Sequence, residues 1–392
     1  MRSTKEANVE GKTVLLRTDF DVPIKSGRIL DDSRIKESIP TIKYLLRNKA
    51  KVLIITHLGR PNEREKKFSL APVARRLKKL LNMPVIFISD ILDKKTKDKI
   101  ESERAGAVVL FENIRFYEEE TKNNFKFAET ISLLGDVYIN DAFPVSHRAH
   151  ASVDAVTRYL PSFAGLALER EIKELSKIKN TPHHPFVVVV GGVKISDKIG
   201  VILNLAKIAD YILIGGASAN VFLKVEGFGL GDSLVEDRAK ELVLKILRKY
   251  SDKIVLPIDV VVSSSLNSKK TETVDITSIP SKICEPPQAV YDIGPKTLIK
   301  WQDIIKTAKT IFWIGPVGVF EKPLFSKGTR MIARTISLSS GETVVGGGDT
   351  VSALDLFRIK KFSHISTAGS AMLQYISGEE LPGLEALERN TK

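Results

Sequence analysis

Residues 186–198 read FVVVVGGVKISDK, an unbroken apolar run followed by two glycines and two lysines. A strand with one face in water alternates apolar and polar residues, whereas an unbroken run of this kind is typical of a strand covered on both faces. Such strands occur mostly in parallel sheets with helices on each side. The stretch therefore predicts a central parallel strand that opens into a glycine-rich loop.

Similar runs recur along the chain in two series, with helix-like segments between them. The first series comprises residues 13–16, 52–55, 85–88, 107–110 and 137–139. The second comprises residues 186–190, 211–214, 254–262, 310–314 and 343–345. This spacing predicts an α/β fold with two doubly wound, mostly parallel-sheet domains, 1–165 and 181–363. Segment 166–180 has apolar residues on a helical period and predicts a linker helix between them.

Composition narrows the class of protein. With 392 residues the chain is long enough for two or three domains, and 60 basic against 47 acidic residues give a net charge of +13. That charge favours nucleic acid, an anionic membrane surface or small phosphorylated substrates, but the lysines are spread over helix-like segments, without a basic tail. No apolar stretch approaches the ~20 residues of a membrane span. With the single Cys284 and no apolar secretory start, a cytoplasmic protein is expected.

Charged residues follow the strands of the first series, in loops that a parallel sheet brings to one edge. They are Asp19, Asp21, His57, Arg60, Arg115 and Arg148. Arginines that converge from separate loops bind phosphate or carboxylate bidentately, and Arg34 can join them. The alternative is that each arginine lies in a surface salt bridge. His147 and His150 are spaced to chelate a metal, but no HExxH motif or cysteine supports zinc.

Asp19 and Asp21 are two residues apart, so on an extended strand end both carboxylates face the same side. They are candidates to accept hydrogen bonds from a substrate hydroxyl. We expect the surrounding arginines to hold them ionised, which disfavours a general-acid role. Turn-capping aspartates are the alternative.

Glycines and lysines follow the strands of the second series, in the motifs GGVKISDK (191–198), GGASAN (215–220), GPVGVFE (315–321) and GGGDT (346–350). Glycines let the backbone approach phosphate oxygens, a helix N-terminus adds partial positive charge, and a carboxylate such as Asp349 can bind Mg²⁺. Lys194 and Lys198 are four residues apart and are expected on one face of a helix, where both ammonium groups reach one anion. Glycines required only by tight turns, and solvated lysines, are the alternatives.

Taken together, eight segments resemble the phosphoglycerate kinase family, in that family's order and over nearly the whole chain. They are RTDFDVP, THLGRP, ENIRF, DAFPVSHRAH, GGVKISDK, GPVGVFE, GGGDT and SHISTAGSA. The resemblance implies reversible phosphoryl transfer between ATP and the carboxylate of 3-phosphoglycerate, giving ADP and 1,3-bisphosphoglycerate, in glycolysis and gluconeogenesis. It implies a 3-phosphoglycerate-binding N-terminal domain, a C-terminal domain that binds MgATP or MgADP, and domain closure. It also implies that segment 364–392 returns to the N-terminal domain.

The resemblance assigns roles to the candidate residues. Asp19 and Asp21 would contact the hydroxyl and carboxylate end of 3-phosphoglycerate, and Arg34 would lie near the transferred group. The substrate's 3-phosphate would be bound by His57, Arg60, Arg115 and Arg148. The nucleotide would be bound by Lys194, Lys198, Gly215, Gly216, Glu321, Gly347, Gly348, Asp349 and Thr350. Arg34, Lys194 and Lys198 would be catalytic, Glu321 would bind the ribose, and Asp349 would bind Mg²⁺.

The chain departs from that family's pattern at several positions. Asp21 and Ile314 each stand where asparagine is usual, Pro144-Val145 replaces a Gly-Thr pair, and Ala368 and Ser370 replace glycines. None of these removes a charge at the reacting centre, so the expected activity stands while substrate affinity can differ.

Two other functions stay open on the residues alone: a basic nucleic-acid-binding protein and a non-catalytic nucleotide-binding scaffold. The first is disfavoured because no recognition module is present and the arginines lie on substrate-like loops, and the second because the transfer-side cations are present in addition to the nucleotide loop. Phosphoryl transfer fits the residue types, because a carboxylate nucleophile is already ionised at neutral pH, needs no general base, and suits a site dominated by cations. The expected partners are the four substrates and products, with no nucleic acid and no membrane. A monomer is expected, and a dimer stays open.

Overall fold

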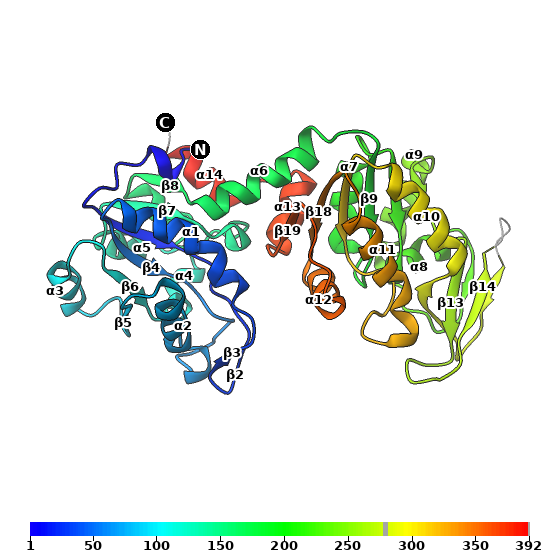
Figure 1. The fold of residues 1–392 in the computed structure, drawn as a ribbon, viewed down its shortest axis with the longest axis horizontal. Coiled ribbons are helices and arrows are strands. Elements are labelled where there is room, and N and C mark those ends of the chain that lie inside the picture. Colours follow the sequence, from blue (N-terminus) through cyan, green and yellow to red (C-terminus); the bar gives the residue numbers. More distant parts are fainter. Residues whose placement is uncertain (277–280, 391–392) are drawn as a thin grey trace. The chain divides into compact units, whose positions relative to one another are not determined.

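The computed structural model describes residues 1–276 and 281–390, which form two compact units. Unit 1 comprises residues 1–173 and 380–392, and unit 2 comprises residues 174–379 (Figure 1). Helix α6 (Leu166–Asn180) contains the boundary between them. No helix in these described residues is long and apolar enough to cross a membrane.

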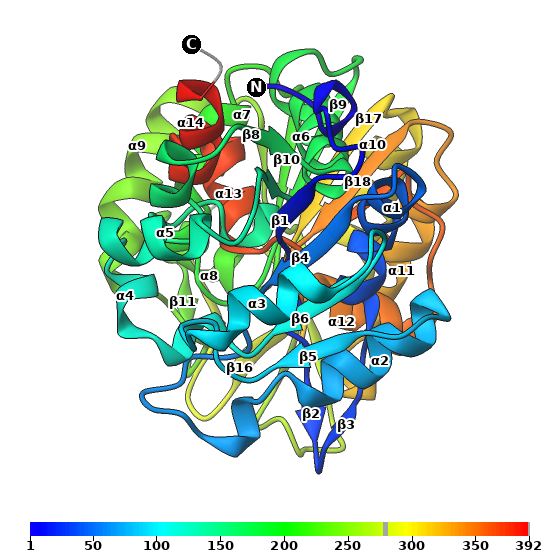
Figure 2. The ribbon, with the colours of Figure 1, turned by 90° about the vertical axis from the view of Figure 1, so that its left-hand side faces the viewer.

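Unit 1 is built on a six-stranded sheet in the order β5-β6-β4-β1-β7-β8, in which every pair is parallel. The strands are β1 (Thr13–Arg17), β4 (Lys51–Ile55), β5 (Ile86–Ile88), β6 (Val108–Phe111), β7 (Val137–Asn140) and β8 (Ser162–Ala164). Figure 2 shows β1, β4, β6 and β5 running side by side. The carboxyl ends of all six strands therefore lie at one edge of the sheet, as the α/β prediction requires.

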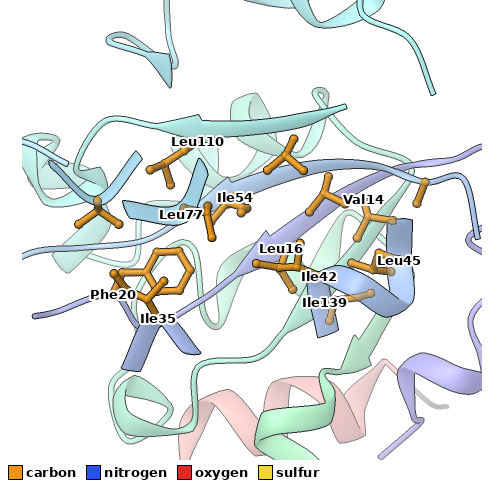
Figure 3. Close-up of a cluster of buried hydrophobic side chains, with 14 of the residues drawn as sticks. Val14, Leu16, Phe20, Ile35, Ile42, Leu45, Ile54, Leu77, Leu110 and Ile139 are labelled. Atoms are coloured by element: carbon orange, nitrogen blue, oxygen red, sulfur yellow. The ribbon is translucent and has the colours of Figure 1, made fainter. Parts of the chain in front are cut away.

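Helices cover this sheet because its strands are apolar on both faces. They are α1 (Ser33–Arg47), α2 (Ala71–Leu81), α3 (Lys95–Ser102), α4 (Glu118–Thr121), α5 (Phe125–Ser132) and α14 (Pro382–Arg389). On one face Leu16 and Ile54 pack with Ile42 of α1 and Leu77 of α2 (Figure 3). Leu15, on the opposite face of β1, is also fully buried, so the doubly covered strands expected from the unbroken runs are confirmed.

Unit 2 repeats this architecture with a sheet in the order β12-β10-β9-β17-β18-β19, again parallel throughout. The strands are β9 (Phe186–Val190), β10 (Tyr211–Ile214), β12 (Ile254–Val255), β17 (Thr310–Ile314), β18 (Glu342–Gly346) and β19 (His364–Ser366). The helices are α7 (Ile199–Leu205), α8 (Gly216–Val225), α9 (Lys240–Tyr250), α10 (Pro295–Thr307), α11 (Lys327–Ser337), α12 (Gly348–Phe357) and α13 (Ser370–Ser377). Trp301 of α10 and Trp313 of β17 are fully buried in its core.

The single strand expected at 254–262 is wrong. The chain forms β12 in the parallel sheet and then β13 (Asp259–Ser263), which joins an antiparallel sheet with β14 (Glu272–Asp275) and β16 (Ala289–Ile293). Pro257 lies between the two strands and has no N–H to donate to a continuous ladder. The remaining described strands form two short two-stranded sheets. In one, β2 (Ile24–Lys25) pairs with β3 (Arg28–Ile29), and in the other, β11 (Gly229–Leu230) pairs with β15 (Lys282–Cys284).

The return of the chain to unit 1 begins at residue 380 and not at 364. Strand β19 pairs with β18, and Asn204 of α7 donates a 2.7 Å hydrogen bond to the carbonyl of Ile376 in α13, so residues 364–379 complete unit 2. In unit 1, Gly383 donates a 2.8 Å hydrogen bond to the carbonyl of Ser146, and Arg2 donates to Asn390 at 2.7 Å. Residues 391–392 of the expected segment lie outside the described residues.

The buried face of unit 1 predicts a large effect of a single truncation. Ile54→Ala removes a fully buried side chain from the cluster in Figure 3 and is expected to lower the free energy of unfolding by about 2–5 kcal/mol. Leu133→Ala is the control, because Leu133 is 68% exposed and should change stability by less than about 0.5 kcal/mol. Urea unfolding followed by circular dichroism measures both, and equal losses would contradict this description of the core.

Candidate functional site

The loop after β1 carries the two predicted aspartates of unit 1. Arg34 Nη1 donates a 2.8 Å hydrogen bond to Asp19 Oδ2, and the Gly59 N–H donates a 2.8 Å hydrogen bond to Asp21 Oδ1. Burial raises the pKa of Asp19 above 3.8, although Arg34 acts in the opposite direction. The arginine charges alone would lower this pKa, which is what the sequence led us to expect. The shift is upward because Asp19 is only 5% exposed, and the sequence did not reveal this burial.

His57 lies between these carboxylates and a buried arginine. Its Nδ1 atom is 3.3 Å from Arg17 Nη2 and 3.9 Å from Asp19 Oδ1, and its Nε2 atom is 3.7 Å from Asp21 Oδ2. Burial, followed by the charges of Arg17 and Arg115, holds the pKa of His57 well below 6.5. The imidazole is therefore neutral at physiological pH and can donate or accept a hydrogen bond there.

Three of the predicted arginines surround one hollow of about 670 Å³ at the edge of the unit 1 sheet. Its lining comprises Arg60, Pro61, Asn62, Arg115, Phe116, Glu118, Thr121, Arg148 and His150. Arg115 Nη1 donates a 2.6 Å hydrogen bond to the Gly59 carbonyl, while its buried Nε and Nη2 atoms have no partner within residues 1–276 and 281–390. Burial and the neighbouring Arg17 and Arg148 lower the pKa of Arg115 to about 10, so the guanidinium stays charged near neutral pH. Arg34 does not line this hollow but binds Asp19.

A buried ion network beneath the hollow was missed by the sequence reasoning. Arg17 is fully buried at the end of β1, where its Nε donates a 2.8 Å hydrogen bond to Ser152 Oγ and its Nη2 lies 3.9 Å from Glu120 Oε1. Glu120 also accepts hydrogen bonds from the N–H and the hydroxyl of Ser152, and lies 3.7 Å from His150 Nδ1. One signal was available: an arginine that ends a strand covered on both faces needs a buried partner.

The strand-end loops of unit 2 pack against one another through their glycines. The Gly192 N–H donates a 2.7 Å hydrogen bond to the Pro316 carbonyl, and the Gly216 N–H donates a 3.1 Å hydrogen bond to the Val317 carbonyl. A Cβ atom added to Gly315 would lie 2.2 Å from the Gly191 carbonyl oxygen, and Gly315 has a φ of +86°. Steric need therefore accounts for this glycine. A Cβ at Gly348, in contrast, would meet open space.

Lys194 and Lys198 do not lie on one face of a helix, so that expectation is wrong. Ser196–Lys198 form a single 3₁₀ turn before α7, and Lys198 Nζ donates a 2.9 Å hydrogen bond back to the Lys194 carbonyl. The turn is held by Glu236, which accepts hydrogen bonds from the N–H and the hydroxyl of Ser196. Burial lowers the pKa of Lys198, whereas the Lys194 side chain is exposed.

The GGGDT motif ends β18 and begins α12, as predicted. Thr350 is fully buried, and its hydroxyl oxygen accepts a 2.7 Å hydrogen bond from the Gly315 N–H. Its side chain therefore joins two loops, and only its backbone N–H, in the first turn of the helix, resembles a phosphate contact. Asp349 is exposed in the same turn.

A cavity of about 370 Å³ lies within unit 2. Gly192, Gly216, Glu321 and Asp349 of the glycine-rich loops line it together with apolar side chains from β13, β16 and the loops beside them. Gly215, Gly347, Gly348, Thr350, Lys194 and Lys198 do not line it, although each of them except Gly347 and Lys198 is next in the chain to a residue that does. In the described part of the chain no group of three or more His, Cys, Asp or Glu side chains is arranged to hold a metal ion.

Comparison with known proteins extends over the whole chain. The phosphoglycerate kinase family model matches residues 4–379. The phosphoglycerate kinase of Thermosipho africanus is 44% identical, with 99% of this chain and 98% of that protein covered. That of Pelotomaculum thermopropionicum is 42% identical, with 98% of each covered. The chain belongs to the phosphoglycerate kinase family.

Solved structures of this family agree with the fold. The phosphoglycerate kinase of Coxiella burnetii has a TM-score of 0.90 at 38% identity, with 100% of this chain and 99% of that chain covered. That of Pyrococcus horikoshii has a TM-score of 0.86 at 33% identity, with the same coverage. Phosphoglycerate kinases are phosphotransferases of glycolysis that use a carboxyl group as acceptor, so the enzyme class expected from the sequence is confirmed.

His150, which is buried, and His147, which is half-buried, predict a pH-dependent stability of unit 1. Burial lowers the pKa of His150 to about 3 and that of His147 to about 4, below the ordinary 6.5. Between these values the unfolded chain binds more protons, so stability is complete above about pH 6.5 and falls on acidification by up to ~1.4 kcal/mol per pH unit for each histidine. Urea unfolding between pH 7 and 4.5 should show a shallower slope for His150→Gln. The exposed His183→Gln should keep the original slope, and a matching loss there would contradict the assignment.

The hydroxyl of Thr350 predicts a second effect. Thr350→Val leaves the buried Gly315 N–H without its acceptor and is expected to cost about 1–3 kcal/mol of stability. It should also weaken binding of ADP, because the two loops lose their connection. Thr350→Ser keeps the hydroxyl and serves as the matched control. Thermal unfolding and titration calorimetry measure both quantities, and a Val variant that behaves like the Ser variant would refute this role.

Proposed function

We propose that this chain catalyses reversible transfer of the γ-phosphoryl group of ATP to the carboxylate of 3-phosphoglycerate, giving ADP and 1,3-bisphosphoglycerate. The proposal rests mainly on the hydrogen bonding of the Arg115 guanidinium. It is anchored to the Gly59 carbonyl, yet two of its buried nitrogens have no partner among the described residues, beside Arg60 and Arg148 at the same hollow. Buried N–H groups without acceptors are costly, so this arrangement favours an oxyanion ligand.

Domain 1–165 would bind 3-phosphoglycerate. Arg60, Arg115 and Arg148 would hold its 3-phosphate, because three guanidinium groups match a dianion in charge and in hydrogen-bond donors. Neutral His57 would donate one further hydrogen bond. Asp19 and Asp21 would accept from the substrate hydroxyl, and their link through His57 supports a shared position at that end.

Domain 181–363 would bind the nucleotide. The N–H groups of Gly347, Gly348 and Thr350 at the start of α12 would bind phosphate oxygens, with Lys194 and Lys198 as counter-charges. The remaining nucleotide contacts would come from Gly215 and Gly216 at the start of α8 and from Glu321, which lines the cavity and would bind the ribose.

Asp349 fits a magnesium ion. The ion commonly takes one or two protein carboxylates and completes its octahedron with phosphate oxygens and water. Asp349 is exposed at the cavity beside a helix N-terminus, and within the described residues no cage of three ligands surrounds it. Bound there, Mg²⁺ would neutralise charge on the nucleotide phosphates.

In the reaction, a substrate carboxylate oxygen forms a bond to the γ-phosphorus while the bond from that phosphorus to the ADP oxygen breaks. The carboxylate is ionised already, so no residue has to remove a proton. Arg34, Lys194 and Lys198 would stabilise the charge on the transferring oxygens. Closure of the two domains about the linker helix 166–180 would bring the ligands together and exclude water.

We further propose that the protein acts in the cytoplasm as a monomer, with these metabolites as its partners and without nucleic acid or a membrane. A single cysteine and basic residues dispersed over many helices support this.

A coupled assay with 3-phosphoglycerate and MgATP tests the proposal. Arg115→Lys should raise the KM for 3-phosphoglycerate about 10- to 100-fold, because the single nitrogen of lysine cannot stay at the Gly59 carbonyl and also occupy the positions of the unpartnered Nε and Nη2 atoms. Arg34→Ala should instead lower kcat by about 10²–10³-fold. Arg75→Ala, an exposed arginine of α2, should match the parent protein. Folded protein without turnover would overturn the function, and an unchanged Arg34→Ala would remove that role.

A further inference from the structure

Asn113 is a fully buried polar residue at the carboxyl edge of the unit 1 sheet. It is the second residue after β6 and does not line the hollow between the arginines. Its amide has two N–H groups and an oxygen with two lone pairs, and all of them are used. Oδ1 accepts hydrogen bonds from the N–H groups of Leu58 at 3.3 Å and Arg115 at 3.1 Å. Nδ2 donates to the carbonyls of Leu58 at 2.8 Å and Phe68 at 3.0 Å.

This side-chain amide takes the place of a peptide group between two loops. Strands β4 and β6 pair as far as Ile54 with Leu110, and this ladder ends before Leu58. Beyond it, the Asn113 amide bonds to both the N–H and the carbonyl of Leu58, as the backbone of a neighbouring strand would. A flipped amide would turn its N–H groups toward N–H groups and its oxygen toward carbonyls, so only one orientation fits. The loop after β4 is therefore held at hydrogen-bond distance from the loop after β6.

These bonds fix the surroundings of Arg115 at both of its ends. Asn113 is the N-cap of the 3₁₀ turn that contains Arg115, and its bond to the Arg115 N–H places the main chain there. The guanidinium, at the other end, donates to the carbonyl of Gly59, the residue after Leu58. The ring of Phe68 occupies the place that a Cβ atom of Gly59 would take, so the bond from Asn113 to the Phe68 carbonyl also acts on Gly59. One amide thus sets the position of Gly59 relative to the turn.

Binding of one anion by several guanidinium groups depends on the separation of those groups. Arg60 and Arg115 line the same hollow from the two loops that Asn113 joins. The unpartnered Nε and Nη2 atoms of Arg115 can meet the oxygens of a bound anion only while the guanidinium keeps its position. Displacement by about 1 Å can cost ~10²-fold in rate even when the altered residue lies away from the chemistry. Loss of the Asn113 amide would therefore affect the anion without removing a charge.

We propose that Asn113 is a positioning residue for 3-phosphoglycerate: its amide holds the loops after β4 and β6 at the separation at which Arg60 and Arg115 bind one phosphate group. The inference rests on the proposed function, because it assumes that this hollow binds the 3-phosphate. Asn113 itself does not line the hollow and carries no charge, so it acts through Leu58 and Arg115. Its loss weakens binding of 3-phosphoglycerate and leaves binding of the nucleotide unchanged.

Calorimetric titration with 3-phosphoglycerate tests this role in wild type, Asn113→Ala and Asn390→Ala. Asn390 is the matched control, because its amide likewise donates to two backbone carbonyls and accepts two hydrogen bonds, and it does not line the hollow. Asn113→Ala should raise the Kd about 10- to 100-fold, and Asn390→Ala should keep the wild-type value. An unchanged Kd in Asn113→Ala, or an equal rise in both variants, would refute the role. Wild-type protein that binds no 3-phosphoglycerate would instead overturn the proposed function.

The coupled assay separates positioning from a general loss of structure. In Asn113→Ala the KM for 3-phosphoglycerate should rise by the same factor of about 10- to 100-fold, while the KM for ATP should keep its wild-type value. A purely structural role would lower the amount of folded enzyme and hence the apparent kcat, and would leave both KM values unchanged. That second pattern would refute the proposal.

Phe68→Ala provides the test if Asn113→Ala fails to fold. Phe68 is half-buried, and removal of its ring leaves no polar group without a partner. Gly59 loses the ring that packs against it, so the Kd for 3-phosphoglycerate should rise about 3- to 10-fold. Phe125→Ala is the control, because that ring is 48% exposed and lies outside the lining of the hollow, and it should bind as wild type does. Equal Kd values in Phe68→Ala and wild type would refute the proposal.

Discussion

Parallel pairing of strands that are buried on both faces is the constraint on which both units depend. Every neighbouring pair in the two six-stranded sheets is parallel, so all carboxyl ends in a sheet lie at one edge. Helices already cover both faces of the sheet, so the loops at that edge do not have to contribute to the hydrophobic core. Polar and glycine-rich loops can therefore gather there, and residues as distant in the sequence as Asp21 and Arg148 reach the same edge.

The edge of unit 1 concentrates positive charge at an electrostatic cost, which the buried network beneath it reduces. Burial lowers the pKa of Arg115, and the charges of Arg17 and Arg148 lower it further, while burial and the charge of Arg60 lower the pKa of Arg148. Glu120 lies fully buried between Arg17 and His150 and supplies the opposite charge. The unpartnered nitrogens of Arg115 are then left for an anionic ligand, whose binding would relieve the remaining repulsion.

The edge of unit 2 meets a different requirement, because its loops must approach one another and also leave room for a ligand. Gly191 and Gly315 serve the first need, since backbone of one loop occupies the place of a Cβ in the other. Gly348 serves the second, since the space beside it is open. Thr350 joins the loops through its hydroxyl. A glycine-rich motif thus combines steric and ligand-facing positions, and the residue type alone does not distinguish them.

The sequence by itself determined the fold class, the strands with unbroken apolar runs and the loops that carry charge, because strand burial and helical period leave a local pattern in the residues. The interruption of the strand at 254–262 had a local signal in Pro257 that the prediction did not use, whereas the return of the chain at residue 380 depended on long-range pairing that has no such pattern. Tertiary structure also decided which polar groups lost water. Burial reversed the expected pKa shift of Asp19 and left two nitrogens of Arg115 without a partner among the described residues. Desolvation depends on everything packed around a group, so no stretch of sequence contains it.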